Sequence, residues 1–477
     1  MAMKPTCIPV PLTERVIDDI IPFAKECAFT QGIMMKTAAE PTSCEVLSYS
    51  PFSLIPTPIP RKAFNAAYDV QTAYNLLYHR VAHDHEFLKN SLSGAVEVDD
   101  FTRNLWNIYE TVRREGINQN VSLCLHRSDY MVDTSSNNNI KQIEFNTIAS
   151  SFAGLSSRIG QMHRFILQRL GHSDLTDKIP ANCPMKGLAE GLVAAWDVYN
   201  NKDAAILFVV ERFTRNSIDK RWHHLSIYEH NPDIKVIWKN FKEINATMTL
   251  REDKTLVVDG VEIAVAYFRT GYTESDYYSE EEWSVRLTLE RSKAIKCPTI
   301  QYQLSGCKKV QQELCRDGVI EKYIPDENVA KQLRLTFARQ YSLDQGPEGD
   351  HAISMALKEP MMYVMKPQRE GGGNNTYGSD IPPLLEQIKD SDERKAYILM
   401  QRIFPCEGQN YLIYQGAPVS LRNTISELGI YGILLGSPEE VMLNKSVGHM
   451  LRTKTAGADE GGVMAGASVI DSPFLID

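Results

Sequence analysis

Two kinds of apolar pattern divide the chain into a mainly helical first part and a later part that contains strands. Apolar residues recur at helical spacing over 15–36 and 69–89, and the proline-rich segment 51–60 connects these two regions. Residues 204–210 instead form a continuous, branched apolar run, which is typical of a buried parallel strand. The first part is therefore expected to serve largely as a scaffold.

The residues after this run complete a small α/β unit. The pattern predicts a helix over 217–229, a strand over 235–238 and a β-hairpin over 255–268. Asp259 and Gly260 lie at the centre of the hairpin and are the residues that tight hairpin turns prefer. We expect an α/β (α+β) fold with one inserted domain. The predicted units are 203–305 for the insertion, and 1–202 together with 306–477 for the larger domain.

Composition and charge exclude several classes of protein. The chain has 477 residues, which suits two or three domains, and its net charge of -9 leaves no basic face for a nucleic acid. Its nine cysteines are scattered and contain no C-x-x-C pair, which indicates reduced thiols. No apolar run approaches membrane-spanning length, and the first residues contain no secretory signal. We expect a cytoplasmic protein with no nucleic-acid or membrane partner, although a leader removed before this sequence begins would allow secretion.

The segment 362–375 carries the strongest chemical signal. An apolar strand leads into Lys366, which is followed by Glu370 and three consecutive glycines, 371–373. Glycines allow close approach and can aim successive backbone N–H groups at an anion, while lysine binds phosphate and glutamate binds the Mg²⁺ that accompanies ATP. The order of these residues fits neither a Walker loop nor a dinucleotide fingerprint. A glycine-rich surface turn is the alternative.

A second candidate group lies on one of two predicted strands, 121–127 and 140–147, which a polar turn separates. Side chains alternate along a strand, so Gln142, Glu144 and Asn146 are expected on one face, and Ile143 and Phe145 on the other. Glu144, Asn146 and Glu370 together with two phosphates would satisfy Mg²⁺. Ordinary alternation in an exposed strand explains the same pattern.

The chain resembles the eukaryotic-type glutathione synthetase family over nearly its whole length. The resemblance implies an ATP-grasp fold with an inserted small α/β substrate-binding domain, and a ligase that is usually a homodimer. Such an enzyme joins γ-glutamylcysteine, or a related thiol peptide, to glycine or another small amino acid, using ATP and Mg²⁺ through an acyl phosphate. The matching segments are 40–43, 127–130, 141–144, 308–314, 366–375, 426–429 and 451–454.

The resemblance also implies roles for individual residues. The implied catalytic residues are Arg452, Arg127 and Lys366, and the implied metal ligands are Glu144, Asn146 and Glu370. The implied ATP contacts are Lys308, Lys366, Gly371, Gly372, Gly373, Asn374, Asn375, Tyr377, Met400, Gln401, Arg402, Ile403, Glu427, Lys454 and Glu460. The implied substrate contacts are Arg127, Ser151, Thr214, Asn216, Lys220, Arg269, Tyr272, Arg452, Val463 and Met464. The segments 371–373 and 455–467 are rich in small residues and are expected to close over the site. The alternative for 455–467 is a disordered C-terminal loop.

Four positions depart from the family pattern: three are implied substrate contacts, and the fourth, Ala149, is expected near the substrate. The family usually carries glutamate where Thr214 stands and glutamine where Lys220 stands, so the local charge becomes more positive. Lys220 would then either hold a carboxylate of the donor or extend into solvent. Met464 replaces a usual alanine and would narrow the acceptor pocket, and Ala149 replaces a frequent serine.

Three hypotheses follow from this combination. The first is a glutathione synthetase with the usual substrates, and the second is a diverged ligase of the same fold with a changed donor or acceptor. The third is a protein that binds nucleotide without catalysis, which the retained Glu144, Glu370 and Arg452 disfavour. We adopt the first reaction and leave the identity of its substrates open.

Overall fold

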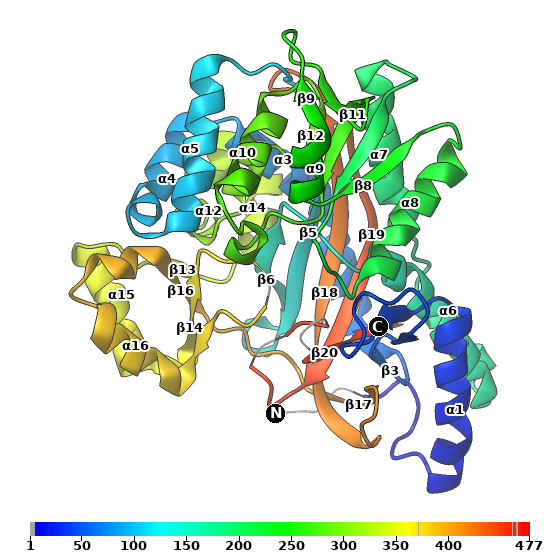
Figure 1. The fold of residues 1–477 in the computed structure, drawn as a ribbon. Helices are drawn as coiled ribbons and strands as arrows, with labels where there is room; N and C mark the ends of the chain where they lie inside the picture. Colours follow the sequence, from blue (N-terminus) through cyan, green and yellow to red (C-terminus); the bar gives the residue numbers. More distant parts are fainter. Residues whose placement is uncertain (1–4, 371, 460, 464–465) are drawn as a thin grey trace.

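The computed structural model describes residues 5–370, 372–459, 461–463 and 466–477. A seven-stranded sheet runs through the centre of the molecule in the order β17-β3-β20-β19-β18-β5-β6 (Figure 1). The long antiparallel hairpin β18–β19 forms its middle, so the last part of the sequence organises strands from the first part. The strands are β3 (Phe52–Ser53), β5 (Ser122–Asp133), β6 (Asn139–Asn146), β17 (Gly408–Ile413), β18 (Leu421–Gly436), β19 (Val441–Thr455) and β20 (Ser468–Asp471).

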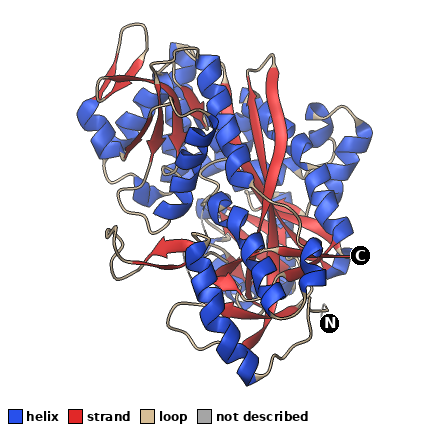
Figure 2. Cartoon of the chain, turned by 90° about the vertical axis from the view of Figure 1, so that its right-hand side faces the viewer, coloured by secondary structure: helices blue, strands red, loops and turns tan. Residues whose placement is uncertain are grey.

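Helices cover both faces of this sheet, as Figure 2 shows. On one face Leu188 and Leu192 of α7 share a buried apolar cluster with Ile433 of β18. On the other face Tyr74 of α3 shares a second cluster with Ile430 of the same strand. These opposite contacts bury both faces of the long hairpin and make it a rigid base. The helices of the first part are α1 (Glu14–Thr30), α2 (Arg61–Asp69), α3 (Gln71–Ala82), α4 (His85–Val98), α5 (Asp100–Glu115), α6 (Ala153–Arg169) and α7 (Pro184–Tyr199).

The helical pattern over 15–36 and 69–89 is confirmed for most of both ranges, but neither range forms one continuous helix. The first helix ends at Thr30, since Gly32 takes a φ of 69° and the chain continues as β1 (Met34–Lys36), which pairs with β2 (Leu47–Tyr49). The second is divided at Asp84, whose carboxylate accepts a hydrogen bond from the Phe87 N–H at 2.9 Å and begins α4. The proline-rich segment contains β3 and β4 (Thr57–Pro60), and β4 pairs with β21 (Pro473–Ile476).

A second sheet is built from residues 205–297 and confirms the predicted run, helix and hairpin. Its parallel strands lie in the order β8-β7-β11-β12, and Asp259 and Gly260 form the hairpin turn with φ values of 51° and 77°. The assignment of 203–305 as a separate domain stays a prediction. The elements are β7 (Ala205–Val209), α8 (Ser217–His230), β8 (Val236–Lys239), α9 (Phe241–Thr247), β9 (Met248–Leu250), β10 (Leu256–Val258), β11 (Val261–Phe268), α10 (Glu280–Arg291) and β12 (Ile295–Cys297).

A third, four-stranded sheet carries the segment that ends in the glycines. Its antiparallel strands lie in the order β13-β16-β14-β15, with α15 and α16 packed against it (left in Figure 1). The apolar strand predicted before Lys366 is thereby confirmed as β14. The elements of this region are α11 (Ile300–Ser305), α12 (Lys308–Leu314), α13 (Val319–Tyr323), α14 (Glu327–Thr336), β13 (Gln340–Ser342), α15 (Pro347–Lys358), β14 (Tyr363–Pro367), β15 (Thr376–Tyr377), α16 (Ile381–Ile388) and β16 (Tyr397–Gln401).

The three sheets and their helices confirm the predicted α/β (α+β) class. Within the described part of the chain, none of the helices combines the length and the apolar character needed to span a bilayer.

Candidate functional site

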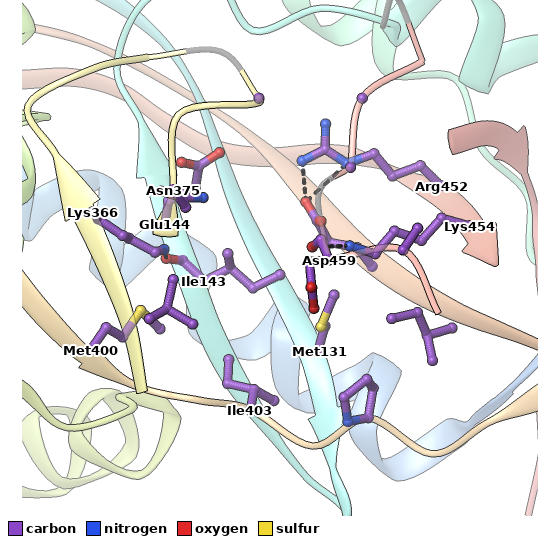
Figure 3. A pocket seen from close by; sticks show the side chains of 18 of the residues that line it. Met131, Ile143, Glu144, Lys366, Asn375, Met400, Ile403, Arg452, Lys454 and Asp459 are labelled. Atoms are coloured by element: carbon purple, nitrogen blue, oxygen red, sulfur yellow. Dashed lines mark hydrogen bonds and ion pairs between the residues drawn. The ribbon is translucent and has the colours of Figure 1, made fainter. Parts of the chain in front are cut away.

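A cavity of about 660 Å³ lies between the four-stranded and the seven-stranded sheet, and Figure 3 shows charged and apolar side chains that line it. Most of the residues implied by sequence meet there. Those that line it are Arg127, Glu144, Asn146, Ser151, Tyr272, Lys366, Glu370, Gly372, Asn375, Tyr377, Met400, Gln401, Arg402, Ile403, Glu427, Arg452, Lys454 and Val463. Lys308, Thr214, Asn216, Lys220, Arg269, Gly373 and Asn374 do not line it. Gly371, Glu460 and Met464 lie outside the described residues.

A β-bulge in β6 changes the predicted alternation. Asp129 of β5 is paired with Glu144, but the next residue, Tyr130, is paired with Gln142, so Ile143 is an extra residue on β6. Ile143 therefore lines the cavity beside Glu144, against the prediction that they face opposite ways. Gln142 is buried and donates to the Ser128 Oγ at 2.7 Å, which removes it from the site. The bulge thus adds Ile143 to the lining of the cavity and removes Gln142 from it.

Lys308 joins the two sheets beside the cavity. Its Nζ lies 3.1 Å from the Glu144 Oε2 and 3.1 Å from the Glu370 Oε1, and the lysine is 4% exposed. Burial disfavours the ionised form of Glu144, but Lys308 and Lys366 outweigh it and lower the pKa of that carboxyl to about 2. For Glu370 burial dominates and its pKa is raised despite Lys308. Two carboxylates therefore converge on one cationic position.

Lys366 reaches the same place from β14. Its Nζ donates to the Ile143 carbonyl at 2.8 Å, so the bulge on β6 also holds this lysine (Figure 3). Burial and the repulsion from Lys308 lower the pKa of Lys366 to about 8, although Glu144 opposes the shift. Binding of an anion beside this buried lysine is favourable, since the negative charge of the anion compensates the positive charge of the lysine.

Two arginines and two carboxylates form the next part of the wall. Arg127 donates from Nε and Nη2 to the two oxygens of Asp129 at 2.6 and 2.7 Å. Arg452 pairs with Glu427 across the β18–β19 register, and its Nη2 lies 3.6 Å from the Asp129 Oδ2. The fully buried Asp129 thus orients both arginines. Sequence reasoning missed Asp129, although it lies two residues after Arg127 in the segment 127–130 and hence on the same strand face.

Asn146 is oriented by the same carboxylate. Its Nδ2 donates to the Asp129 Oδ2 at 2.9 Å and to the Arg127 carbonyl at 3.0 Å. Because both donors of the amide point toward β5, its oxygen is the atom left for a ligand in the cavity.

The loop that follows β6 is held in a conformation that only tertiary contacts can maintain. Ala149 and Phe152 have positive φ values of 52° and 73°, which non-glycine residues rarely adopt. Asp219 of α8 accepts from the Phe152 and Gly154 N–H groups at 2.8 and 2.9 Å, and so fixes the start of α6. Ser151 is thereby placed between the two larger sheets.

The predicted donor contacts gather at this junction. Arg269 donates to the Ser151 Oγ at 2.7 Å and to the Ser150 carbonyl at 2.8 Å, while Arg127 donates to the Ser151 carbonyl at 3.3 Å. The alternative that Lys220 extends into solvent was wrong. Lys220 is 2% exposed, forms an ion pair with Glu211, and lies 3.4 Å from the Thr214 Oγ1. Glu211 was missed because nothing in the sequence tells which carboxylate meets Lys220.

Apolar residues also contribute to the lining of the cavity, among them Met131, Met362, Val364 and Met400. The N–H groups of Gln401 and Arg402 already donate to the carbonyls of residues 339 and 362, at 2.8 Å each. Any ligand that hydrogen-bonds to the backbone of the 400–403 segment would therefore use its other backbone groups.

The described part of the glycine- and alanine-rich segment 455–467 lies over the cavity. Asp459 joins it to both sheets, because its carboxylate accepts from the Arg402 Nη2 at 2.8 Å and its carbonyl accepts from the Lys454 Nζ at 2.6 Å. Gly461, Gly462 and Val463 continue the lining.

The described residues contain no group of three or more His, Cys, Asp or Glu side chains arranged for a metal ion. Glu144, Glu370 and the Asn146 oxygen form a smaller set of hard oxygen donors. Mg²⁺ commonly keeps only one or two carboxylates in nucleotide sites, and substrate phosphates and water complete its octahedron. The residues present therefore fit a phosphate-bound Mg²⁺.

Comparison with known proteins identifies one family over nearly the whole chain. The model of the "Eukaryotic glutathione synthase, ATP binding domain" family matches residues 14–475. Glutathione synthetases of Homo sapiens and Xenopus laevis are 45% and 42% identical over 97% of this chain and 98% of theirs. A chloroplastic glutathione synthetase of Arabidopsis thaliana is 41% identical, over 90% of this chain and 79% of its own. The apo structure of a glutathione synthetase-like effector of Globodera pallida covers 98% of each chain, with 25% identity and a TM-score of 0.78.

Proposed function

The chain belongs to the eukaryotic glutathione synthetase family, and we propose that it joins γ-glutamylcysteine to glycine with the conversion of ATP to ADP and phosphate. The observation that carries this proposal is the convergence of Glu144 and Glu370 on Lys308, at 3.1 Å each, where the ATP-grasp cavity meets its glycine-rich loop. Such a cluster holds polyphosphate together with a cation. The chain is an ATP-dependent ligase.

The chemistry follows from the poor reactivity of a carboxylate. An oxygen of the donor's cysteinyl carboxylate attacks the γ-phosphorus of ATP, and the bond to ADP breaks, which gives an acyl phosphate. The glycine nitrogen then attacks the acyl carbon, loses a proton, and phosphate leaves with its oxygen. Lys308 and Lys366 hold the phosphates, and Arg452 and Arg127 neutralise charge that develops on the oxygens of the reacting carboxylate. No enzyme nucleophile is needed.

We propose Glu144, Glu370 and the Asn146 oxygen as the residues that would hold Mg²⁺. When bound, the ion neutralises phosphate charge and orients the γ-phosphoryl group. Lys308 keeps the two carboxylates together, and Asp129 keeps the oxygen of Asn146 turned toward them.

The segment over the cavity protects the intermediate. An acyl phosphate hydrolyses in water, so productive transfer requires that the acceptor amine, and not water, reaches it. The Asp459 contacts to Arg402 and Lys454 hold this segment against both sheets. We propose that these contacts re-form after each substrate enters.

The remaining assignments are also proposals. We propose that the base of ATP lies among Met131, Met362 and Met400, and that the donor peptide extends past Ser151 toward Arg269. The homodimeric state and cytoplasmic location expected from the resemblance stay predictions, and plant relatives are named chloroplastic. Neither the diverged ligase nor the non-catalytic alternative is favoured by relatives that match across the whole chain.

The test is ADP release by the purified protein with Mg-ATP, γ-glutamylcysteine and glycine, with each substrate omitted in turn and the product identified by mass. Synthesis that requires both substrates supports the proposal. ATP turnover without glutathione formation, or only with another acceptor, contradicts it.

A further inference from the structure

Three consecutive side chains attach the segment before the glycine triplet to different parts of the molecule. The Gln368 Oε1 accepts a hydrogen bond from the Lys309 N–H at 3.0 Å, and the Glu370 Oε1 lies 3.1 Å from the Lys308 Nζ. Both of these contacts hold the segment to α12. Arg369 lies between the two residues, and its side chain extends to other partners.

Arg369 joins two segments that are far apart in the sequence. Its side chain is 26% exposed, and its guanidinium donates to the carboxylates of Asp99 and Glu274. It also donates to the Gln368 carbonyl at 2.9 Å, which fixes its direction. The other oxygen of Asp99 accepts from the Thr102 N–H at 2.7 Å and begins α5. Asp99 thus anchors the guanidinium to a helix, and Glu274 attaches it to the loop after β11.

The loop that contains Glu274 also contributes to the main cavity. Within it, the Asp276 carboxylate accepts from the three successive N–H groups of 271–273 at 3.0–3.1 Å. Tyr272 of this loop lines the cavity of about 660 Å³, as does Glu370. Because one carboxylate holds the loop together, a displacement of Glu274 also displaces Tyr272. The ion pair of the preceding paragraph therefore connects two segments that line one cavity from different sheets.

We propose that Arg369 is a positioning residue that couples nucleotide binding to donor binding through its ion pair with Glu274. This inference rests on the proposed function, because it assumes that phosphates bind at Lys366 and that the donor contacts Tyr272. Phosphates held at Lys366 restrain the segment that carries Arg369, and the ion pair transmits this restraint to the donor loop. The coupling is reciprocal, so each ligand raises the affinity of the other by the same factor.

The test is titration calorimetry of γ-glutamylcysteine with and without saturating Mg²⁺ and AMP-PNP, an ATP analogue that prevents turnover. For the wild type we expect the analogue to lower the Kd for γ-glutamylcysteine by about fivefold. In Glu274→Gln the Kd without the analogue should stay within about twofold of the wild type, and the analogue should no longer lower it. Glu280→Gln, an exposed position in the first turn of α10, is the matched control and should keep the fivefold effect.

Arg369→Gln removes the same ion pair from the other side. The double variant Arg369→Gln/Glu274→Gln should lose no more coupling than either single variant, because all three lack the same interaction. Arg369→Gln also leaves the buried Asp99 without its cation and can lower stability, whereas Glu274→Gln keeps the pair of Arg369 with Asp99 and decides the question alone.

Independent binding of the two ligands to the wild type, or full coupling in Glu274→Gln, would overturn the role of Arg369 and leave the proposed function standing. A wild type that binds γ-glutamylcysteine in neither condition would instead overturn the proposed function, and this inference with it.

Discussion

The phosphate end and the donor end of the site are built in different ways. At the phosphate end Glu427 and Arg452 are directly paired across two strands, and Asp129 is paired with Glu144 in the same sheet. At the donor end Glu211 and Lys220 come from a loop and from the following helix. Strand pairing fixes the first set, whereas the second depends on the path of an irregular loop. At the donor end, a substitution at one position can therefore be compensated more easily by a residue at a neighbouring position.

The largest effect is expected where the two carboxylates converge. Glu370→Ala should lower ATP-dependent synthesis by on the order of 10³-fold, because it removes a proposed metal ligand and one partner of Lys308. Initial rates at saturating Mg-ATP measure this loss, and the midpoint of thermal unfolding should remain within a few degrees of the wild type.

The matched control is Glu386→Ala, which removes an exposed glutamate of α16, the helix packed against the four-stranded sheet. A surface ion pair of this kind contributes about 0–1 kcal/mol, so synthesis should be unchanged. Wild-type rates in Glu370→Ala would remove Glu370 from the metal site and would weaken the contrast between the two ends.

The second effect concerns geometry rather than charge. Arg452→Lys keeps the positive charge but loses the fork that reaches both Glu427 and Asp129. We expect kcat to fall by about 100-fold while the KM for ATP changes less than about threefold. Arg422→Lys, at an exposed position of β18, is the control and should have no effect. A comparable increase in the KM for ATP would mean that Arg452 binds ATP in the ground state.

Much of the fold and of the phosphate end could be predicted from the sequence, because both depend on local signals. The continuous run at β7, the Asp-Gly turn after β10 and the lysine-to-glycine segment each carry their structure in a few residues. Helix ends were predicted less well. The break at Asp84 depends on one capping hydrogen bond within a pattern that otherwise continues.

The rest depends on contacts between distant segments. The bulge at Ile143 is set by pairing with β5, and no periodicity within β6 alone reveals it. Asp129 and Glu211 were missed for the same reason, since each acts through partners that only the folded chain brings near. Lys220 could not be assigned to solvent or to the interior without knowing where Glu211 lies.

A smaller effect should appear in the pH dependence of ATP binding. Burial and Lys308 lower the pKa of Lys366 to about 8, and only the protonated form attracts phosphate. As pH rises through this value the free protein loses the charge, so the Kd for Mg-ATP should increase about tenfold from pH 7 to pH 9. Titration calorimetry at several pH values measures it. Lys366→Arg keeps its charge in this range and should remove the increase, whereas an unchanged pH profile would assign the titration to another group.

The smallest effect tests whether compensation at the donor end is complete. Thr214→Glu adds a second carboxylate near Lys220, whose Nζ lies 3.4 Å from the Thr214 Oγ1. If Glu211 already provides the negative charge, the KM for γ-glutamylcysteine should change less than about threefold in the wild-type background. Glu211→Gln alone should raise the KM for γ-glutamylcysteine, and Thr214→Glu in that background should restore most of the loss, because a carboxylate returns beside Lys220 from a position three residues later. Steady-state kinetics on the four proteins gives the coupling. Equal effects of Thr214→Glu in both backgrounds would mean that the two positions act independently, and that the donor end, like the phosphate end, is fixed residue by residue.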